Sequence, residues 1–468
     1  MNYLDSNAIL HPNHHGSRKG HSTATALIQM YDTWVKAVDE GDMAGVMMVD
    51  LSAAFDMVDH AILLDKLKLM GLDSQAVEWM SSYLGGRSQC VCVDGCLSPF
   101  LDIMCGVPQG SVLGPLLYIL FTNDLPDVVH MEHEQSYQDP NLHCTPCGSL
   151  VNYVDDGTYT FTHKDPNMLS QVLSDKYRAV EEYMVNNKLV INADKTHLVV
   201  MGSRKMDTDR QAVRLTAGLH TILPSVSEKL LGCNIHQNLK WQAHIQNAES
   251  SLTKQLTSRL NALQKVSVHA CFKTRLSAAN GVFMSSLAYL LPLWGGCEGY
   301  LVKALQVLQN KAARQVTKLS WYTPVRKLLG QCNWLSIRQM IFYHSCLTVY
   351  RTTKTGVPVY LRQNLSRDQR SEPNRFPARS TRGIAPDMYG VGESDLEEVD
   401  SSDEDGDSDD EWRQGAGGDG IGPLVQKSFL FRAAESFNQI PDNIRLCRTL
   451  PLFKKKLKQW IKLNIPYD

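Results

Sequence analysis

Residues 149–162 read SLVNYVDDGTYTFT, and this stretch decides how the rest of the chain is interpreted. Apolar and polar side chains alternate on both sides of Asp155-Asp156-Gly157, a pattern typical of a β-hairpin with acidic residues at its turn. Two adjacent carboxylates repel each other unless a cation lies beside them. Asp-Asp-Gly is also an ordinary turn sequence, so the hairpin by itself leaves both a metal site and a plain turn open.

A third carboxylate stands at the end of a second expected strand. Gly45 to Val49 is a short apolar run that predicts a buried strand, and Asp50 follows it directly. Burying a carboxylate is costly unless it is paired or binds a metal. Asp50 together with Asp155 and Asp156 would offer the hard oxygen ligands that Mg²⁺ prefers. Two such ions can hold the attacking and leaving oxygens of a phosphoryl transfer.

The apolar pattern divides the chain into a mixed first half and a helical second half. Up to about residue 240, helical stretches are interspersed with short expected strands. Beyond it, residues 252–263, 273–290 and 300–319 have helical spacing. Residues 366–423 are rich in Arg, Pro, Gly, Ser and acids, so we expect a disordered linker there. A compact basic segment follows it.

Charge is unevenly distributed along the chain. The 468 residues carry a formal net charge of −2, but residues 393–411 hold twelve acids and no Lys or Arg. Without this insert, 47 basic residues face 37 acidic ones (49 less 12), a net charge of +10. A basic body suggests a polyanionic partner. The insert would be a solvated spacer, or it would mimic nucleic acid and occupy the basic surface.

Several protein classes are disfavoured by the sequence. No run of about 18 apolar residues predicts a membrane span, and the first ten residues lack a secretory signal pattern. We therefore expect an intracellular protein of the nucleus or cytoplasm, with its twelve cysteines reduced. Zinc binding is left open at two groups, although no second CxxC pair is present: Cys90, Cys92 and Cys96, and His143 with Cys144 and Cys147.

Five short motifs occur in order along the chain. They are VDLSAAFD at 49–56, GVPQGS at 106–111, YVDD at 153–156, NADKT at 192–196 and LLG at 230–232. In this order they resemble motifs A, B, C, D and E of reverse transcriptases. The wording of residues 50–60 and 106–117 is similar to non-LTR (LINE-type) retrotransposons, as are residues 11–23 and the helical C-terminal stretches.

The resemblance implies a right-hand polymerase fold of the α+β class, whose palm is an antiparallel sheet with helices on one face. It would place partial fingers at 1–44, the palm with further fingers elements at 45–240, a helical thumb at 241–365, the acidic linker at 366–423 and a basic helical segment at 424–468. The implied activity is RNA-directed DNA synthesis. Such an enzyme extends a primer 3′-hydroxyl with dNTPs on an RNA template, using two Mg²⁺ or Mn²⁺ ions.

The resemblance also assigns roles to single residues. Asp50 and Asp155 would bind both metal ions, with Asp156 in support. Lys195 would lie near the pyrophosphate as a charge partner or proton donor. Phe55 would be a gate under the sugar that favours dNTPs, with plain core packing as the alternative. The other implied substrate contacts are Gln109 and Gly110 at the nucleotide and template, and Arg18 at the triphosphate.

Some features depart from the family pattern. Ser17 stands where an aromatic residue is usual, and Val154 where a small one is usual. Because valine is β-branched and suits a strand, we do not expect Val154 to abolish catalysis. The family's first fingers motif and its endonuclease would lie before Met1, so we expect an N-terminally truncated chain. Two alternatives stay open: an inactive relic that only binds nucleic acid, and a related polymerase such as an intron maturase, against which the C-terminal third argues.

Overall fold

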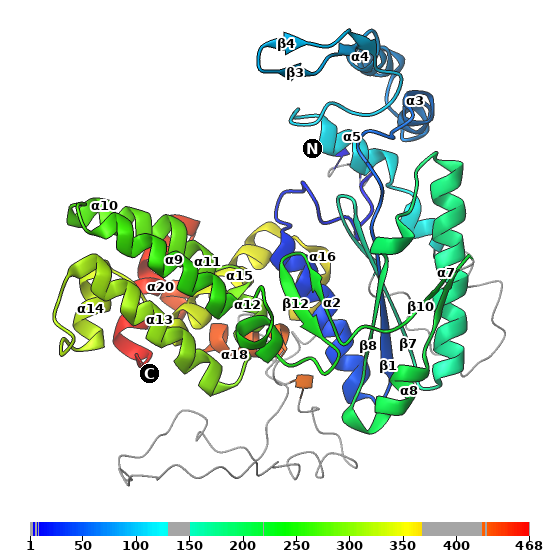
Figure 1. Cartoon of the computed structure of the whole chain (residues 1–468). Coiled ribbons are helices and arrows are strands. Elements are labelled where there is room, and N and C mark those ends of the chain that lie inside the picture. The colour runs from blue at the N-terminus through cyan, green and yellow to red at the C-terminus, as the bar shows by residue number, and fades with distance from the viewer. Residues whose placement is uncertain are drawn as a thin grey trace.

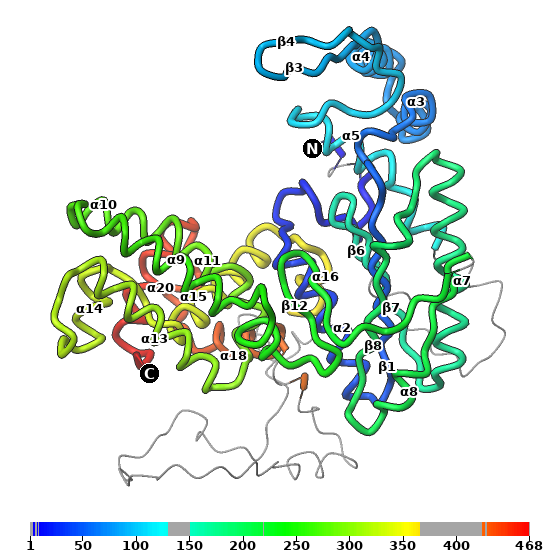
Figure 2. The backbone as a smooth tube through the Cα atoms, viewed as in Figure 1, coloured from blue at the N-terminus to red at the C-terminus, as the bar shows by residue number. Residues whose placement is uncertain are grey.

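The computed structural model describes residues 3–4, 7, 9–129, 150–218, 220–366, 424–425 and 428–467. Figure 1 shows a small group of elements around α3 and α4 at the top, a sheet with α7 below it on the right, and a large helical group on the left. The tube in Figure 2 follows the chain from the sheet up to this top group and back before it enters the helical group. These three groups occupy the places of fingers, palm and thumb, and we use those words for them.

The strands are short except in the palm. They are β1 (Met43–Val49), β2 (Ser88–Gln89), β3 (Cys92–Val93), β4 (Cys96–Leu97), β5 (Leu101–Asp102), β6 (Leu150–Tyr153), β7 (Asp156–His163), β8 (His197–Met201), β9 (Leu215–Ala217), β10 (His220–Ile222), β11 (Ser227–Leu230) and β12 (Cys233–His236). The helices are α2 (Thr23–Asp39), α3 (His60–Leu69), α4 (Ser74–Leu84), α5 (Gly114–Phe121), α7 (Pro166–Asn186), α8 (Asp207–Ala212), α9 (Leu252–Ser267), α10 (Phe272–Ala278), α11 (Ser285–Leu287), α12 (Leu291–Trp294), α13 (Gly299–Thr317), α14 (Val325–Cys332), α15 (Ile337–Thr355), α16 (Val359–Ser366), α18 (Phe429–Asn438), α19 (Asp442–Arg445) and α20 (Leu450–Asn464). There are also two short 3₁₀ helices, η1 (Ala193–Lys195) and η2 (Arg204–Met206), and two π-helical segments, η3 (Ala243–Asn247) and η4 (Ala279–Met284).

The palm is a four-stranded antiparallel sheet in the order β6-β7-β1-β8. Every residue of β1 is buried, in agreement with the strand expected from its unbroken apolar run. Because β1 lies between β7 and β8, its end is held on both sides by backbone hydrogen bonds. The position of Asp50 is therefore fixed by the sheet.

Helices cover both faces of this sheet, which corrects the expectation of helices on one face. Alternate β1 side chains belong to different cores: Val46 and Met48 pack with α2 and the thumb, whereas Met47 and Val49 pack with α7 and the fingers. On the α2 side, the Trp34 indole Nε1–H donates to Thr160 Oγ1 over 2.9 Å. The reason lies in the composition of β1, which is apolar at every position except Gly45 and therefore needs cover on each face.

The thumb is a helical bundle, as expected, and one of its helices contains a π-helical segment. The helix expected at 273–290 runs without interruption from α10 through η4 to α11, and its π-helical part is Ala279–Met284. This part contains Asn280-Gly281, and both residue types weaken the ordinary α-helical pattern in helix interiors. The expected helices at 252–263 and 300–319 correspond to α9 and α13.

The C-terminal helices pack into the thumb core, far in sequence from their neighbours. Tyr350 of α15 stacks on Phe453 of α20 with ring centroids 3.9 Å apart, and its hydroxyl donates to the Cys447 carbonyl. Where the described chain resumes, the Asp39 carboxylate accepts hydrogen bonds from the backbone N–H groups of Leu424 and Val425. Residues 428–467 are thus an integral part of the bundle.

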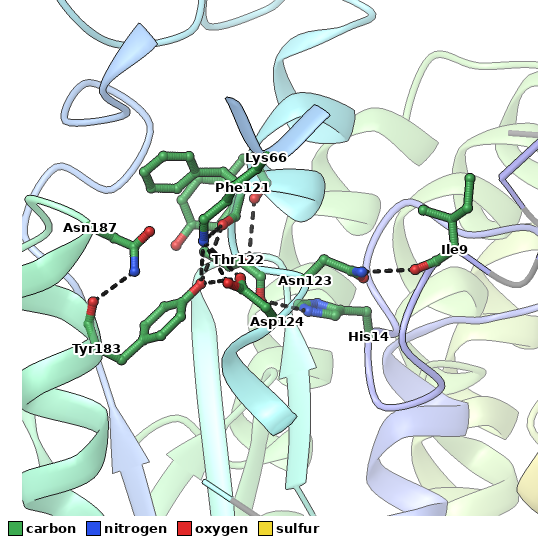
Figure 3. A network of polar contacts seen from close by, with 10 residues as sticks. Ile9, His14, Lys66, Phe121, Thr122, Asn123, Asp124, Tyr183 and Asn187 are labelled. Carbon is green, nitrogen blue, oxygen red and sulfur yellow. Dashed lines mark hydrogen bonds and ion pairs between the residues drawn. The ribbon is translucent and has the colours of Figure 1, made fainter. Parts of the chain in front are cut away.

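A polar network joins the fingers to the palm (Figure 3). The Lys66 ammonium on α3 donates to Asp124 Oδ1 over 2.7 Å and to the Phe121 carbonyl over 2.7 Å. The Tyr183 hydroxyl on α7 donates to the same carboxylate over 2.6 Å. Beside it, His14 Nε2 lies 3.2 Å from the Thr122 carbonyl oxygen, which can only accept, so this ring nitrogen carries the proton. The network holds α3, the end of α5, α7 and the N-terminal segment together.

Replacing Lys66 by Met is expected to lower the free energy of unfolding by about 2 kcal/mol, because Asp124 and the Phe121 carbonyl lose their charged donor. The Lys66 side chain is only 13% exposed. Lys68→Met is the matched control, since that exposed lysine pairs with Asp65 one turn away, and it should cost below about 0.5 kcal/mol. Urea unfolding measures both, and equal losses would contradict the role given to the network.

Candidate active site

The register of the sheet brings Asp50 to the turn that carries the paired acids. Val49 at the end of β1 lies opposite Gly157, and Asp156 is the first residue of β7. Asp50 therefore lies at the end of β1 that is next to the turn between β6 and β7, where Asp155 and Asp156 stand. Asp155 and Asp50 lie close enough for their charges to act on the Asp156 carboxyl group. Three acids from two distant parts of the chain thus share one edge of the palm.

The turn itself differs from the expected one. β6 ends at Tyr153 and β7 begins at Asp156, so the two turn residues are Val154 and Asp155, and Asp156-Gly157 already belongs to the strand. The expectation that Val154 suits a strand is wrong, because its φ is +63°. A β-branched residue is strained in this left-handed region.

The N-terminal segment packs directly against this turn. The His15 N–H donates to the Asn152 carbonyl over 2.9 Å, and the Asn152 N–H donates to the Asn13 carbonyl over 3.0 Å. A Cβ atom on Gly16 would lie 2.7 Å from the Val154 backbone nitrogen, so only glycine fits there. Residues 13–16 therefore hold the strained turn in place.

Lys195 provides a cation beside the acid at the end of β1. Its ammonium lies 3.3 Å from Asp50 Oδ2, and the Asn192 N–H donates to the Asp50 carbonyl over 2.9 Å. The 3₁₀ turn η1 thus places residue 195 beside the expected metal ligands. The side chain is 66% exposed, so it has room to turn toward a bound anion.

The acids fit a cation electrostatically. Partial burial of Asp156, followed by the charges of Asp155 and Asp50, raises the pKa of the Asp156 carboxyl to about 6. A divalent cation at this edge would relieve that repulsion, and the oxygen ligands suit Mg²⁺ or Mn²⁺. Within the described part of the chain, however, no three His, Cys, Asp or Glu side chains are already grouped to hold a metal ion. The three carboxylates are neighbours, and Lys195 is the charge partner of Asp50.

Asp156→Asn is expected to make the metal-free protein more stable at neutral pH. The folded-state pKa of Asp156 is raised above its ordinary value, so wild-type stability falls as the pH rises from about 4 through about 6. The variant does not lose stability in this way. Its free energy of unfolding at pH ~7.5 should exceed that of wild type by less than about 1 kcal/mol, because the side chain reaches solvent. At pH ~4 the advantage should vanish. Urea unfolding at both pH values in chelator-treated buffer is the measurement, and an advantage that grew toward acid would contradict it.

Phe55 packs against α5, the helix that carries Tyr118. Its ring stacks on Tyr118 with centroids 4.9 Å apart and planes inclined by 30°. Its carbonyl accepts from the Val107 N–H over 2.9 Å, so residues 49–56 and 106–111 are joined by backbone. The ring is half-buried, which leaves both the gate role and plain packing compatible with its position.

The glycine-rich loop at 106–111 folds onto the turn that follows Asp50. Gln109 is exposed, and its Nε2 donates to Asp56 Oδ1 over 2.9 Å. Gly110 has a φ of +79° and open space around its Cα. The loops 49–56 and 106–111 are thus in contact and bring Phe55 and Gln109 close together. The side-chain bond between Asp56 and Gln109 is a further link between these loops.

Arg18 makes contacts different from those the resemblance implies. Its guanidinium donates to the carbonyl oxygens of His11 and His14, over 2.8 and 3.1 Å. These bonds stabilise the N-terminal segment that packs against Val154. A contact of Arg18 with a triphosphate stays a prediction.

The LLG motif forms the tip of a hairpin. β11 and β12 are joined by Leu231 and Gly232, both with positive φ, and the Leu231 carbonyl accepts from the Tyr289 hydroxyl over 2.8 Å. Tyr289 belongs to the thumb, so this hairpin connects the palm with the thumb.

The sequence profile described as "Reverse transcriptase (RNA-dependent DNA polymerase)" matches residues 1–245, more than half of the chain. The chain belongs to the reverse transcriptase family. It is 26% identical over 325 residues to the RNA-directed DNA polymerase from mobile element jockey of Drosophila funebris, covering 67% of this chain and 32% of that protein. It is also 26% identical over 344 residues to the probable RNA-directed DNA polymerase from transposon BS of Drosophila melanogaster, covering 72% and 36%. This confirms the family resemblance drawn from the five motifs.

The chain spans about a third of the length of the curated relatives it matches. Among solved structures, the apo telomerase from Candida tropicalis matches with a TM-score of 0.37 and 12% identity, covering 77% of this chain and 59% of that one. The antiparallel palm sheet with its packed helices and the helical thumb agree with the fold expected of a reverse transcriptase.

Two residues of this reverse transcriptase site were not found from the sequence. Tyr118 lies under Phe55, and burial together with nearby Asp155 and Asp156 raises its pKa. In the sequence, Tyr118 lies within the apolar helical stretch 114–121, and no local pattern distinguishes it from its neighbours. Asp56 ends the motif at 49–56, and its bond to Gln109 becomes visible only when the two loops are placed together.

The remaining expectations concern cysteines and membranes. Cys92 and Cys96 lie on paired strands β3 and β4 and are exposed, and no metal-binding group occurs in the ranges that the structure describes. His143, Cys144 and Cys147 lie outside the described residues, as does the acidic insert. In the described helices, none has the length and apolar character needed to cross a membrane.

Proposed function

We propose that this chain is the polymerase core of an RNA-directed DNA polymerase of the non-LTR retrotransposon type. It would extend the 3′-hydroxyl of a DNA primer with dNTPs on an RNA template, inside the cell, in the nucleus or cytoplasm. The observation that carries the proposal is the register of β1 with β7, which brings Asp50 to Asp155 and Asp156 in a chain of the reverse transcriptase family.

The residues divide the work as follows. Asp50 and Asp155, with Asp156 in support, would hold two Mg²⁺ or Mn²⁺ ions, which when bound activate the attacking hydroxyl and neutralise the leaving pyrophosphate. Lys195, now paired with Asp50, would swing to the pyrophosphate as a charge partner or proton donor. Phe55, backed by Tyr118, would lie under the sugar and exclude a 2′-hydroxyl. Gln109 and Gly110 would contact the nucleotide and template. Arg18 would lie near the triphosphate, and its bonds to the His11 and His14 carbonyl oxygens stabilise the segment that packs against the turn.

A second candidate is an inactive protein that binds nucleic acid only. One observation favours it: Asp50 Oδ2, one of the expected metal-binding oxygens, is already paired with the Lys195 ammonium over 3.3 Å.

Primer extension with the purified chain separates the two candidates. A DNA primer annealed to an RNA template should be elongated with dNTPs and Mg²⁺, and chelation should stop the reaction. Binding of the same template–primer in a gel shift without any incorporation, with either metal, would support the inactive candidate instead.

A further inference from the structure

The thumb carries charge of almost one sign. Residues 251–366 contain fifteen Lys and Arg and a single acid, Glu298. Glu298 is the N-cap of α13, whereas the basic residues continue to the other end of that helix and beyond it. The end of the thumb at which α13 finishes therefore has cations and no acid from this stretch.

Two loops meet at that end, and we call residues 265–273 and 311–327 the thumb-end surface. The Lys318 ammonium donates to Ser267 Oγ over 3.2 Å, and Arg275 Nε donates to the Val316 carbonyl over 2.8 Å. The flanking helices α10 and α14 lie at the edge of the molecule opposite the palm sheet (Figure 1). This surface is therefore distinct from the edge that carries the acids.

Two aromatic side chains project from this surface into solvent. Trp321 is 65% exposed and Tyr322 is 93% exposed, on the loop between α13 and α14. The loop is held by its own contacts: Arg314 lies over the Trp321 ring at 4.3 Å and donates to its carbonyl over 3.1 Å. The Thr323 N–H donates to the Ser320 carbonyl over 3.0 Å. Exposing two large aromatic rings to water is unfavourable, and folding of the loop does not require it.

The cations around these rings are themselves exposed. Lys311, Lys318, Arg326 and Lys327 surround the loop in sequence, and Lys265 and Lys273 flank the neighbouring one; all six are exposed. Single-stranded nucleic acid offers the matching chemistry, since its phosphates need cations and its unpaired bases stack on aromatic rings. A duplex offers only phosphates here, because its bases are already stacked on each other.

We propose that the thumb-end surface binds single-stranded nucleic acid, with Trp321 and Tyr322 as stacking rings and the surrounding lysines and arginines as phosphate contacts. The proposal is independent of polymerase activity, because it concerns binding at the opposite end of the thumb from the acids. RNA and DNA strands share this chemistry, and separate probes distinguish them.

The test compares strands with and without bases. Fluorescence anisotropy of the full chain is measured with labelled oligo(U), oligo(dT) and an abasic oligonucleotide of equal length, about 15 nucleotides, in ~0.2 M KCl to weaken phosphate contacts. Wild type should prefer the base-containing strands over the abasic one. Trp321→Ala and Tyr322→Ala should each reduce that preference by roughly fivefold or more, and Trp321→Phe should retain most of it. The stronger of the oligo(U) and oligo(dT) signals identifies the preferred strand.

Tyr300→Ala is the matched control, because Tyr300 is an exposed aromatic residue at the other end of α13. It should keep the wild-type preference, and thermal unfolding should show that each variant is folded. A preference unchanged in both Trp321→Ala and Tyr322→Ala would overturn the proposal and point to a protein partner for these rings. An equal loss in Tyr300→Ala would overturn it as well, because the effect would then not belong to this surface.

Discussion

Primer extension on an RNA template is expected to fall by a factor on the order of 10³ when Asp155 is replaced by Asn. The change keeps the shape of the side chain but removes one of the charges that would hold the metal ions, and such ions supply several kcal/mol of transition-state stabilisation. Asp155 lies in the two-residue turn between β6 and β7 and not in the core of the sheet, so the variant should remain folded.

The control is Asp42→Asn, which removes an acid from just before the opposite end of the same central strand. Single-nucleotide incorporation rates are compared for wild type, Asp155→Asn and Asp42→Asn, and template–primer binding is measured in parallel. Asp42→Asn should be close to wild type. Synthesis at the wild-type rate in Asp155→Asn would contradict the assignment of Asp155 to the catalytic centre. Loss of template–primer binding in that variant would show that Asp155 acts in substrate binding.

Gly106→Ala is expected to lower the free energy of unfolding by about 3 kcal/mol. The residue has a φ of +90°, and a Cβ there would lie 2.8 Å from the Asp56 carbonyl oxygen and 2.9 Å from its Cα. The alanine is therefore destabilised in two ways: by the left-handed backbone conformation, and by a clash of its Cβ with the Asp56 backbone. Since Val107 bonds to Phe55 next to it, the clash should also separate the two loops of the nucleotide site.

Gly110→Ala isolates the clash from the backbone cost. Gly110 has a similar φ of +79°, but a Cβ added there would meet no atom within 4 Å, so its substitution should cost only about 1 kcal/mol. Urea unfolding of both variants gives the difference directly. If the two losses are equal, the close approach to Asp56 is not what requires glycine at position 106.

Much of the architecture could be predicted from local patterns. The apolar run before Asp50 predicted β1, the spacing of residues 252–263 and 300–319 predicted α9 and α13, and the five ordered motifs indicated the family. These succeeded because each depends on residues near one another in the sequence. Predictions failed where distant packing decides the outcome: Val154 adopts a positive φ against Gly16, and helices cover both faces of the palm sheet and not one.

By itself, the sequence determined which acids stand at strand ends and in which order the motifs follow. Only the tertiary structure decided that Asp50 lies beside the 155–156 turn, that Tyr118 backs Phe55, and that Lys195 pairs with Asp50. The physical reason is that strand register, ring stacking and this ion pair are contacts between residues 63 to 145 positions apart in the sequence. Periodicity fixes which face of an element is apolar, but it does not fix the partner against which that face packs.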